Sequence, residues 1–269
     1  MITGKTKIFG VIADPIDHVR APMVFNPVFV EQGIDAVMVP IHLKAAQLGA
    51  QLSALAHMPN MGGICVTIPF KLDVAALCDE LGLAAQMTGA VNAVRFDEGR
   101  LIGDNFDGAG FTAGLKGEGY DLKGKSVLMI GAGGAARAIA ASLSAEPIAS
   151  LGIANRTRDK ADAIKSLITA HHPNATIVIV DQNDIDLAIA EYDIIINTTS
   201  LGLHDGDAMP CALDHARTDT VIADIIMIPE ITSWMAAAQD KGLNVHAGRH
   251  MLDYQRDLIG RFIGALPAE

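Results

Sequence analysis

The chain has few cysteines, few aromatic residues and no long apolar run. Its three cysteines, Cys65, Cys78 and Cys211, lie far apart and form neither a C-x-x-C pair nor a metal-ligand spacing. Isolated thiols are typical of a reducing compartment, so we expect a cytoplasmic protein without disulfides. The apolar stretches are broken well before the roughly 18 residues that a membrane span needs, and residues 1–10 lack the apolar segment of a secretory signal. We therefore expect no membrane partner.

Positive charge is also scarce. The 269 residues carry 20 Lys and Arg against 31 Asp and Glu, a formal net charge of −11. Nucleic acids reward clustered positive charge, so we expect no nucleic-acid partner. A small anion needs only local donors and stays compatible with this balance. The nine histidines show no paired ligand spacing with Cys or carboxylates, so no metal site is expected. Monomer and homodimer are both open.

Short apolar runs alternate with helix-like stretches, which predicts an α/β fold with mainly parallel sheets. A hairpin with a Gly-containing turn over 90–104 interrupts this order, and we place a domain boundary after it. We expect an N-terminal α/β substrate domain over 1–107 and a Rossmann-type doubly wound parallel sheet over 108–247, with a C-terminal helix in 248–269 that joins the first domain. The predicted strands are 7–13, 36–41, 63–68, 126–130, 148–154, 176–180, 193–197, 220–225 and 244–247. The predicted helices are 22–32, 45–57, 73–81, 108–117, 135–144, 160–171, 232–241 and 251–263.

A glycine-rich turn follows the predicted strand 126–130 and precedes a helix of small residues. In a G-x-G-x-x-A turn of this kind, the first glycine permits the tight turn and the second lets the backbone approach a pyrophosphate at the helix N-terminus. The strand–turn–helix context favours a dinucleotide site, although a glycine-rich loop without a ligand is the alternative. The residues of the turn are Gly131, Ala132, Gly133, Gly134, Ala135 and Ala136.

The tip of the next predicted strand indicates which dinucleotide binds. An NAD site usually places an acid there for the ribose hydroxyls. Here the strand ends in Asn155, Arg156, Thr157 and Arg158. Arginine matches phosphate geometry with a planar, permanently charged fork, so this tip favours the 2′-phosphate of NADP. Asp159 comes directly after and leaves NAD as the less favoured cofactor.

Two polar residues of the first domain suggest proton transfer. Lys71 lies just beyond the end of a predicted strand, where α/β sheets open onto a crevice, and Asp107 follows the hairpin at the domain boundary. A carboxylate that orients an amine is a plausible proton-transfer pair. An ordinary surface lysine and a turn aspartate are the alternative interpretation.

Ordered motifs over nearly the whole chain resemble the shikimate dehydrogenase family. They include 14–18 with Pro22 and Asn26, 66–71, 89–92, 103–108, 131–136, 155–157, 197–202 and 248–252 with Gln255. The resemblance implies hydride transfer between NADP(H) and a ring hydroxyl or ketone, with Lys71 as the proton-transferring residue and Asp107 as its partner. It also implies that Thr67, Asn92 and Gln255 hold substrate hydroxyls and that Thr198 and Gly248 lie on the cofactor side.

The sequence departs from the family pattern at substrate positions. Val19 and Ala21 stand where the family usually has two serines that hold a carboxylate, and Met227 stands where it usually has a tyrosine. Losing two hydrogen bonds to a charged group costs roughly 3–6 kcal/mol, on the order of 10²–10⁴ in affinity. We therefore expect the family's chemistry on a changed small-molecule substrate, such as a related cyclic hydroxy acid, quinate-like, or another polyol. A non-catalytic NADP-binding sensor is the alternative, which retention of Lys71 and Asp107 opposes.

Overall fold

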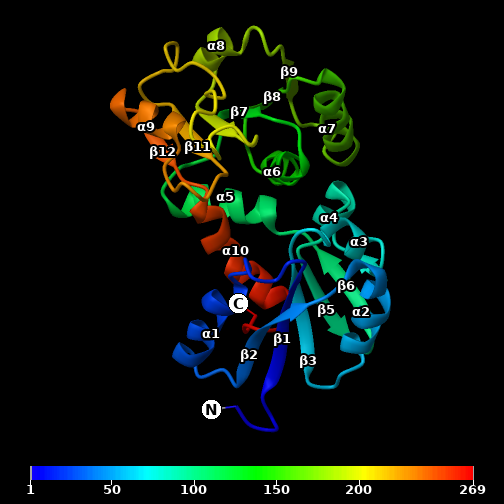
Figure 1. Ribbon diagram of the computed structural model, residues 1–269. Helices are drawn as coiled ribbons and strands as arrows, with labels where there is room; N and C mark the ends of the chain where they lie inside the picture. Colours follow the sequence, from blue (N-terminus) through cyan, green and yellow to red (C-terminus); the bar gives the residue numbers. More distant parts are fainter. Residues whose placement is uncertain (1, 269) are drawn as a thin grey trace. The chain divides into compact units, whose positions relative to one another are not determined.

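A computed structural model describes residues 2–268, which form two compact units, each with its own sheet (Figure 1). The first unit contains the chain up to Phe106 together with the residues from Gln255 onward, and the second runs from Asp107 to Tyr254. Within the described range, no helix is both long and apolar enough to cross a bilayer. The fold is α/β, as the alternation of apolar runs predicted.

The first unit is built on a mixed sheet of six strands in the order β2-β1-β3-β5-β6-β4. Strands β1, β2 and β3 are parallel, whereas β5 runs antiparallel to both β3 and β6. The predicted hairpin is therefore present, with Glu98 and Gly99 at positive φ in its turn. The strands are β1 (Lys7–Ala13), β2 (Ala36–His42), β3 (Met61–Val66), β4 (Glu80–Leu81), β5 (Ala93–Asp97) and β6 (Arg100–Asp104).

Both faces of this sheet are covered because its central strands are apolar on both sides. Along β1, Phe9 and Val11 enter one core cluster while Ile12 enters another, as the alternation of side chains in a strand requires. Helix α1 (Ala21–Glu31) and the end of α10 (Arg249–Phe262) pack on the first face. The opposite face is covered by α2 (Leu48–Ala56), α3 (Lys71–Ala75) and α4 (Leu83–Thr88), while the short η1 (Ala45–Gln47) before α2 is exposed.

The second unit has a parallel sheet of six strands in the order β12-β11-β10-β7-β8-β9. The chain runs outward from β7 through β8 to β9 on one side, then returns to β10 on the other side of β7. This reversal defines a topological switch point between β7 and β10, where open α/β sheets bind ligands. The strands are β7 (Ser126–Ile130), β8 (Ser150–Ala154), β9 (Ile177–Val180), β10 (Ile194–Asn197), β11 (Val221–Asp224) and β12 (Asn244–His246).

Helices cover both faces of the second sheet, which makes it doubly wound. In β7, Val127 and Met129 enter the cluster that also contains side chains of α5, α6 and α7, whereas Leu128 enters the cluster of α8, η2 and α9. These helices are α5 (Asp107–Gly117), α6 (Gly134–Ser144), α7 (Arg158–His171), α8 (Ile185–Ala188), η2 (Ile189–Glu191) and α9 (Ser233–Asp240). The predicted Rossmann-type arrangement is confirmed.

Some predicted elements differ from the structure. The helix expected over 73–81 is wrong, because α3 ends at Ala75 and Glu80–Leu81 forms a short strand beside β6. The cause is tertiary pairing, since β4 joins a sheet edge that the local sequence does not reveal. Strand β3 ends at Val66, earlier than expected, and the short helices α4 and α8 were not predicted.

Candidate functional site

The carboxyl edge of the first sheet collects most of the predicted substrate residues. Ile12 of β1 aligns with Val66 of β3, so the segments that follow these two parallel strands leave the sheet side by side. Ala93 at the start of β5 pairs with Asp104 at the end of β6, which brings the residues before β5 and after β6 to the same edge. These pairings bring Thr67, Asn92, Asn105 and Phe106 to the same edge. Val19 and Ala21 share a core cluster with Phe106, and Lys71 is joined through its carbonyl to Val91, the residue before Asn92.

Hydrogen bonds fix the backbone at this edge. The Lys71 carbonyl accepts from the N–H of Val91 at 2.9 Å, and the Asn92 carbonyl accepts from the N–H of Val66 at 2.8 Å. The side-chain Oδ1 of Asn92, which is buried, accepts from the N–H of Phe106 at 2.9 Å. Lys71 thus begins α3 on a braced backbone, and Asp107, the first residue of α5, directly follows a residue that Asn92 holds.

An apolar surface lies beside these polar groups. Val19, Ala21 and Phe106 are partly buried and pack against the same core cluster as α1 and the end of α10. The rings of Phe106 and Phe262 lie 5.1 Å apart between centroids. The guanidinium carbon of Arg95 lies 5.7 Å from the Phe262 ring centroid. The two positions where the family resemblance implied serines are therefore part of an apolar patch.

Two polar residues of the first motif, Asp14 and Asn26, make contacts that stabilise the fold. Asp14 accepts from Lys44 at 2.8 Å and lies 2.9 Å from His42 Nε2, and these hydrogen bonds lower the pKa of its carboxyl. The Asn26 side chain bonds both the N–H and the carbonyl of Met38, at 2.8 and 3.0 Å, and so ties α1 to β2. Neither assignment was visible in the sequence, because each partner lies in a different element.

The remaining predicted substrate residues lie further along the chain. Gln255 is buried on α10, on the part of this helix that belongs to the first unit. Met227 is half-buried and packs against the core of the second unit. It follows β11, whose last residue Asp224 is buried and bonded to Asn197 and Thr232. Burial raises the pKa of the Asp224 carboxyl despite these bonds.

The glycine-rich turn lies at the switch point of the second sheet. Gly131 has φ +116°, and a Cβ on it would stand 2.5 Å from Thr198 Oγ1. The Thr198 hydroxyl and N–H both donate to the Ile130 carbonyl at 2.8 Å, so the ends of β7 and β10 are held together there. Gly133 is the N-cap of α6 and faces open space, with no heavy atom within 4 Å of its Cβ position.

A hollow of about 500 Å³ lies over this turn. Free N–H groups at the start of α6, the helix dipole and the open space at Gly133 suit a pyrophosphate. The observed cradle therefore fits a dinucleotide. The lining residues are Ile130, Gly131, Ala132, Gly133, Asn155, Arg156, Gln182, Thr198, Thr199, Ser200, Leu201 and Pro210.

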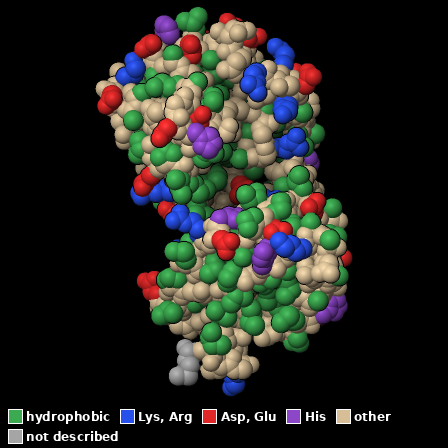
Figure 2. Space-filling model, in the orientation of Figure 1, with side chains coloured by type: hydrophobic (Ala, Val, Ile, Leu, Met, Phe, Trp, Pro, Cys, Tyr) green, Lys and Arg blue, Asp and Glu red, His purple; other side chains and the backbone are tan. Residues whose placement is uncertain are grey.

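A second hollow, of about 290 Å³, adjoins the first at Asn155, Arg156 and Gln182. Its other lining residues include Arg158, which also forms an ion pair with Asp162 at 3.6 Å. Figure 2 shows Lys and Arg side chains grouped on the flank of this unit where α7 lies. Two arginines beside the cradle suit a further phosphate, and Thr157 precedes α7 as its N-cap.

Gly248 packs against backbone rather than facing open space. A Cβ there would stand 2.5 Å from both the Ile225 carbon and the Ile226 oxygen. Ala135 lies in the first turn of α6, beside the cradle.

The sequence did not predict Gln182, which lines both hollows from the loop after β9. Its place at the cradle becomes apparent only when the strand order is known.

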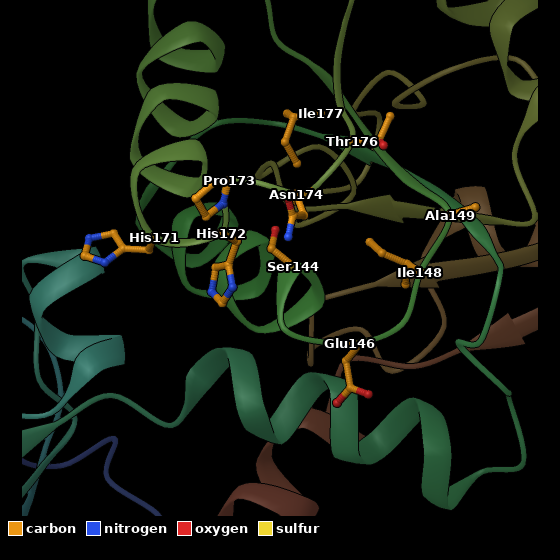
Figure 3. Close-up of a pocket in the computed structure, with 11 residues that line it drawn as sticks. Ser144, Glu146, Ile148, Ala149, His171, His172, Pro173, Asn174, Thr176 and Ile177 are labelled. Atoms are coloured by element: carbon orange, nitrogen blue, oxygen red, sulfur yellow. The ribbon is translucent and has the colours of Figure 1, made fainter.

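A different hollow of the second unit, of about 330 Å³, lies at the opposite edge of the sheet (Figure 3). It is lined by the C-terminal ends of α6 and α7, which carry partial negative charge, and by Glu146, which pairs with Lys116 at 2.6 Å. These features disfavour an anionic cofactor. The described residues contain no group of three or more His, Cys, Asp or Glu side chains placed to hold a metal ion.

The fold and this site together define the class of protein: an α/β protein with a dinucleotide cradle on one unit and a lysine-bearing sheet edge on the other. Residues 11–94 match the shikimate dehydrogenase substrate binding domain, and residues 114–240 match shikimate / quinate 5-dehydrogenase. The chain belongs to the shikimate dehydrogenase family.

Curated relatives agree with this assignment. A shikimate dehydrogenase (NADP(+)) from Geobacillus kaustophilus is 36% identical over 93% of this chain and 89% of its own length. Among solved structures, shikimate 5-dehydrogenase from Listeria monocytogenes, in complex with shikimate and NAD, has a TM-score of 0.91 at 29% identity and covers 98% of this chain and 94% of its own. The 5-ketofructose reductase of a Gluconobacter strain has a TM-score of 0.88 at 29% identity, with coverages of 99% and 96%.

Proposed function

We propose that this protein is an NADP-dependent dehydrogenase that transfers hydride between NADP(H) and a ring hydroxyl or ketone, of shikimate and 3-dehydroshikimate or of a related cyclic substrate. The observation that carries the proposal is the combination of an open phosphate cradle at the switch point with Lys71 on a braced sheet edge. The relatives' names, shikimate dehydrogenase (NADP(+)), support the same reaction class.

One set of residues would handle the substrate. We assign Lys71 and Asp107 to proton transfer, with Lys71 placing a proton on the carbonyl oxygen, or removing it from the hydroxyl in the reverse direction. Thr67, Asn92 and Gln255 would hold substrate hydroxyls, because a hydroxyl and two amides offer both donors and acceptors. Val19, Ala21 and Met227 would supply apolar contacts.

Residues of the second unit would hold the cofactor. When bound, NADPH supplies the hydride. The turn from Gly131 to Ala135 would bind the pyrophosphate through backbone N–H groups, with Thr198 bracing it and Gly248 shaping the backbone nearby. Asn155, Arg156, Thr157 and Arg158 would hold the 2′-phosphate, which favours NADP over NAD.

The test is Lys71→Ala, with Lys5→Ala as a control at an exposed lysine remote from the site. We expect Lys71→Ala to lose more than about 100-fold in kcat while the Kd for NADPH, followed by fluorescence titration, stays within threefold. If the wild-type protein binds NADPH but turns over neither shikimate nor related ring alcohols or ketones, the dehydrogenase assignment is wrong and the NADP-binding sensor takes its place.

A further inference from the structure

We infer that the site on the first unit selects an uncharged polyhydroxy ketone, or the polyol formed from it, in preference to a carboxylic acid. The inference rests on the proposed function, because it names the substrate class of the same reaction. The starting observation is that Val19, Ala21 and Phe106 pack on one core cluster and that the N–H of Phe106 is bonded to Asn92, at the sheet edge where Thr67 and Lys71 follow β3.

The apolar patch disfavours a carboxylate. Val19, Ala21 and Phe106 are partly buried on one core cluster, and the Phe106 ring is further covered by Phe262. A carboxylate placed against these side chains would lose water and gain no hydrogen-bond donor from them. Burying an ionised group without partners is among the most costly arrangements in a protein, whereas the CH groups of a polyol gain from the same contact.

The charge at this edge also opposes an anion. The charged side chains in the segments that follow β1, β2, β3 and β6 are acidic at Asp14, Asp17, Asp73 and Asp107 and basic at Arg20, Lys44 and Lys71. Acids are thus in excess, and Lys44 is already bound to Asp14 at 2.8 Å. Because we assign Lys71 to proton transfer, Arg20 is the remaining lysine or arginine of these described segments that could attract a carboxylate. Arg20 is exposed at the N-cap of α1 and makes no side-chain cap bond.

The polar groups that remain suit hydroxyls. Thr67 carries one hydroxyl, and Asn92 and Gln255 carry amides, so all three are neutral and can both donate and accept. Vicinal hydroxyls present the same mixed character, whereas a carboxylate presents acceptors alone. The 5-ketofructose reductase that resembles this chain over nearly its whole length is named for an uncharged keto sugar, which is the chemistry we infer.

The reaction balances with the cofactor already proposed. NADPH, when bound, would supply one hydride to the carbonyl carbon. The C=O π bond would become an O–H bond with the proton from Lys71, and solvent would restore the lysine proton. The products are the secondary alcohol and NADP⁺. No carboxylate takes part in this step, so the charge of the substrate affects binding and not the chemistry.

The test compares probes that carry a carboxylate with probes that lack one. Shikimate and its methyl ester share one ring, and their oxidation with NADP⁺ is followed by absorbance of the reduced cofactor. We expect kcat/KM for the ester to equal or exceed that for the acid, and NADPH-dependent reduction of 5-ketofructose to be faster than that of 3-dehydroshikimate at equal concentration. A preference of tenfold or more for the acids would overturn the inference while leaving the proposed function intact.

Two variants sharpen this test. Val19→Ser combined with Ala21→Ser supplies hydroxyl donors, so we expect the acid-to-ester ratio of kcat/KM to rise about tenfold or more. Arg20→Ala should change that ratio by less than threefold; a fall of tenfold or more would show that Arg20 holds a carboxylate and the inference is wrong. If the folded wild-type protein binds NADPH yet turns over none of the four probes, both the proposed function and the inference fail.

Discussion

The buried side chain of Asn92 accepts a hydrogen bond from the backbone N–H of Phe106 at 2.9 Å, and this bond joins the start of β5 to the residue before Asp107. Asn92 thereby has a positioning role in addition to the substrate contact we propose for it. Asn92 thus fixes the backbone just before Asp107, the residue that we propose as the partner of Lys71 in proton transfer.

Replacing Asn92 tests this role. Asn92→Ala leaves the Phe106 N–H without its acceptor, which costs about 1–3 kcal/mol and loosens the backbone before Asp107. We expect kcat to fall by more than about tenfold and the melting temperature to fall. Asn92→Asp is the matched variant, since a carboxylate keeps the acceptor; it should retain more of the thermal stability than Asn92→Ala. Equal melting temperatures for wild type and Asn92→Ala would contradict the assignment.

The cofactor turn offers a contrast between two glycines. Gly131 needs its positive φ, and a Cβ placed on it would stand 2.5 Å from Thr198 Oγ1, so Gly131→Ala should cost about 1–3 kcal/mol of stability and weaken NADPH binding. Gly133 has ordinary φ −85° and open space around it, so Gly133→Ala should fold normally and weaken NADPH binding alone. Thermal unfolding with and without NADPH separates the two effects.

If Gly133→Ala melts at as low a temperature as Gly131→Ala, the glycine at position 133 is required for folding, and a role of its open space in binding a ligand is not supported. Unchanged NADPH affinity in Gly133→Ala would contradict the location of the pyrophosphate.

Arg156 governs the expected preference for NADP. It lines both adjoining hollows, and a hydrogen bond to a charged group contributes about 1.5–3 kcal/mol. Arg156→Gln should therefore raise the Kd for NADPH about 10–100-fold and change the Kd for NADH by less than threefold. Lys165→Gln, at an exposed lysine on the same helical flank, is the control. A parallel loss of affinity for both cofactors would place the arginine elsewhere on the dinucleotide.

The sequence predicted the elements that repeat a regular pattern. The strand before Gly131 and the helix after it were readable because a buried strand, a glycine turn and a small-residue helix occur in succession. The two-residue hairpin turn at Glu98 and Gly99 was readable for the same reason. Strand β4 was not, because its two residues gain their strand character from pairing with β6.

The candidate site was readable where a motif carries its own chemistry and unreadable where contacts are long-range. Local sequence patterns predicted Lys71 at the end of one strand and Arg156 at the tip of another. No local pattern predicted Gln182. It lies at the cradle because β9, the strand before it, is placed two strands from β7 in the folded sheet. The structural use of Asn26 likewise depends on β2, which follows it in the chain by a turn.

His246 predicts a dependence of stability on pH. Its ring is 1% exposed, and neither ring nitrogen has a hydrogen-bond partner within residues 2–268. It lies between Phe111 and Tyr120 and stacks on His250, with centroids 4.9 Å apart. Burial, with a smaller contribution from His250, lowers the pKa of His246 to about 4 from its ordinary value near 6.5.

The direction of this pH dependence follows from proton uptake by the unfolded chain. Between about pH 6.5 and pH 4 the unfolded chain binds a proton at His246 that the folded chain does not, so the free energy of unfolding decreases as the pH falls through this window. The loss is about 3–4 kcal/mol at most, because one pKa unit corresponds to about 1.4 kcal/mol. His246→Phe removes the group that titrates and keeps an aromatic ring against Phe111 and Tyr120. Urea unfolding at pH 7 and pH 4.5 should show a smaller pH-dependent loss in the variant than in wild type; equal losses would mean that His246 does not titrate in this range.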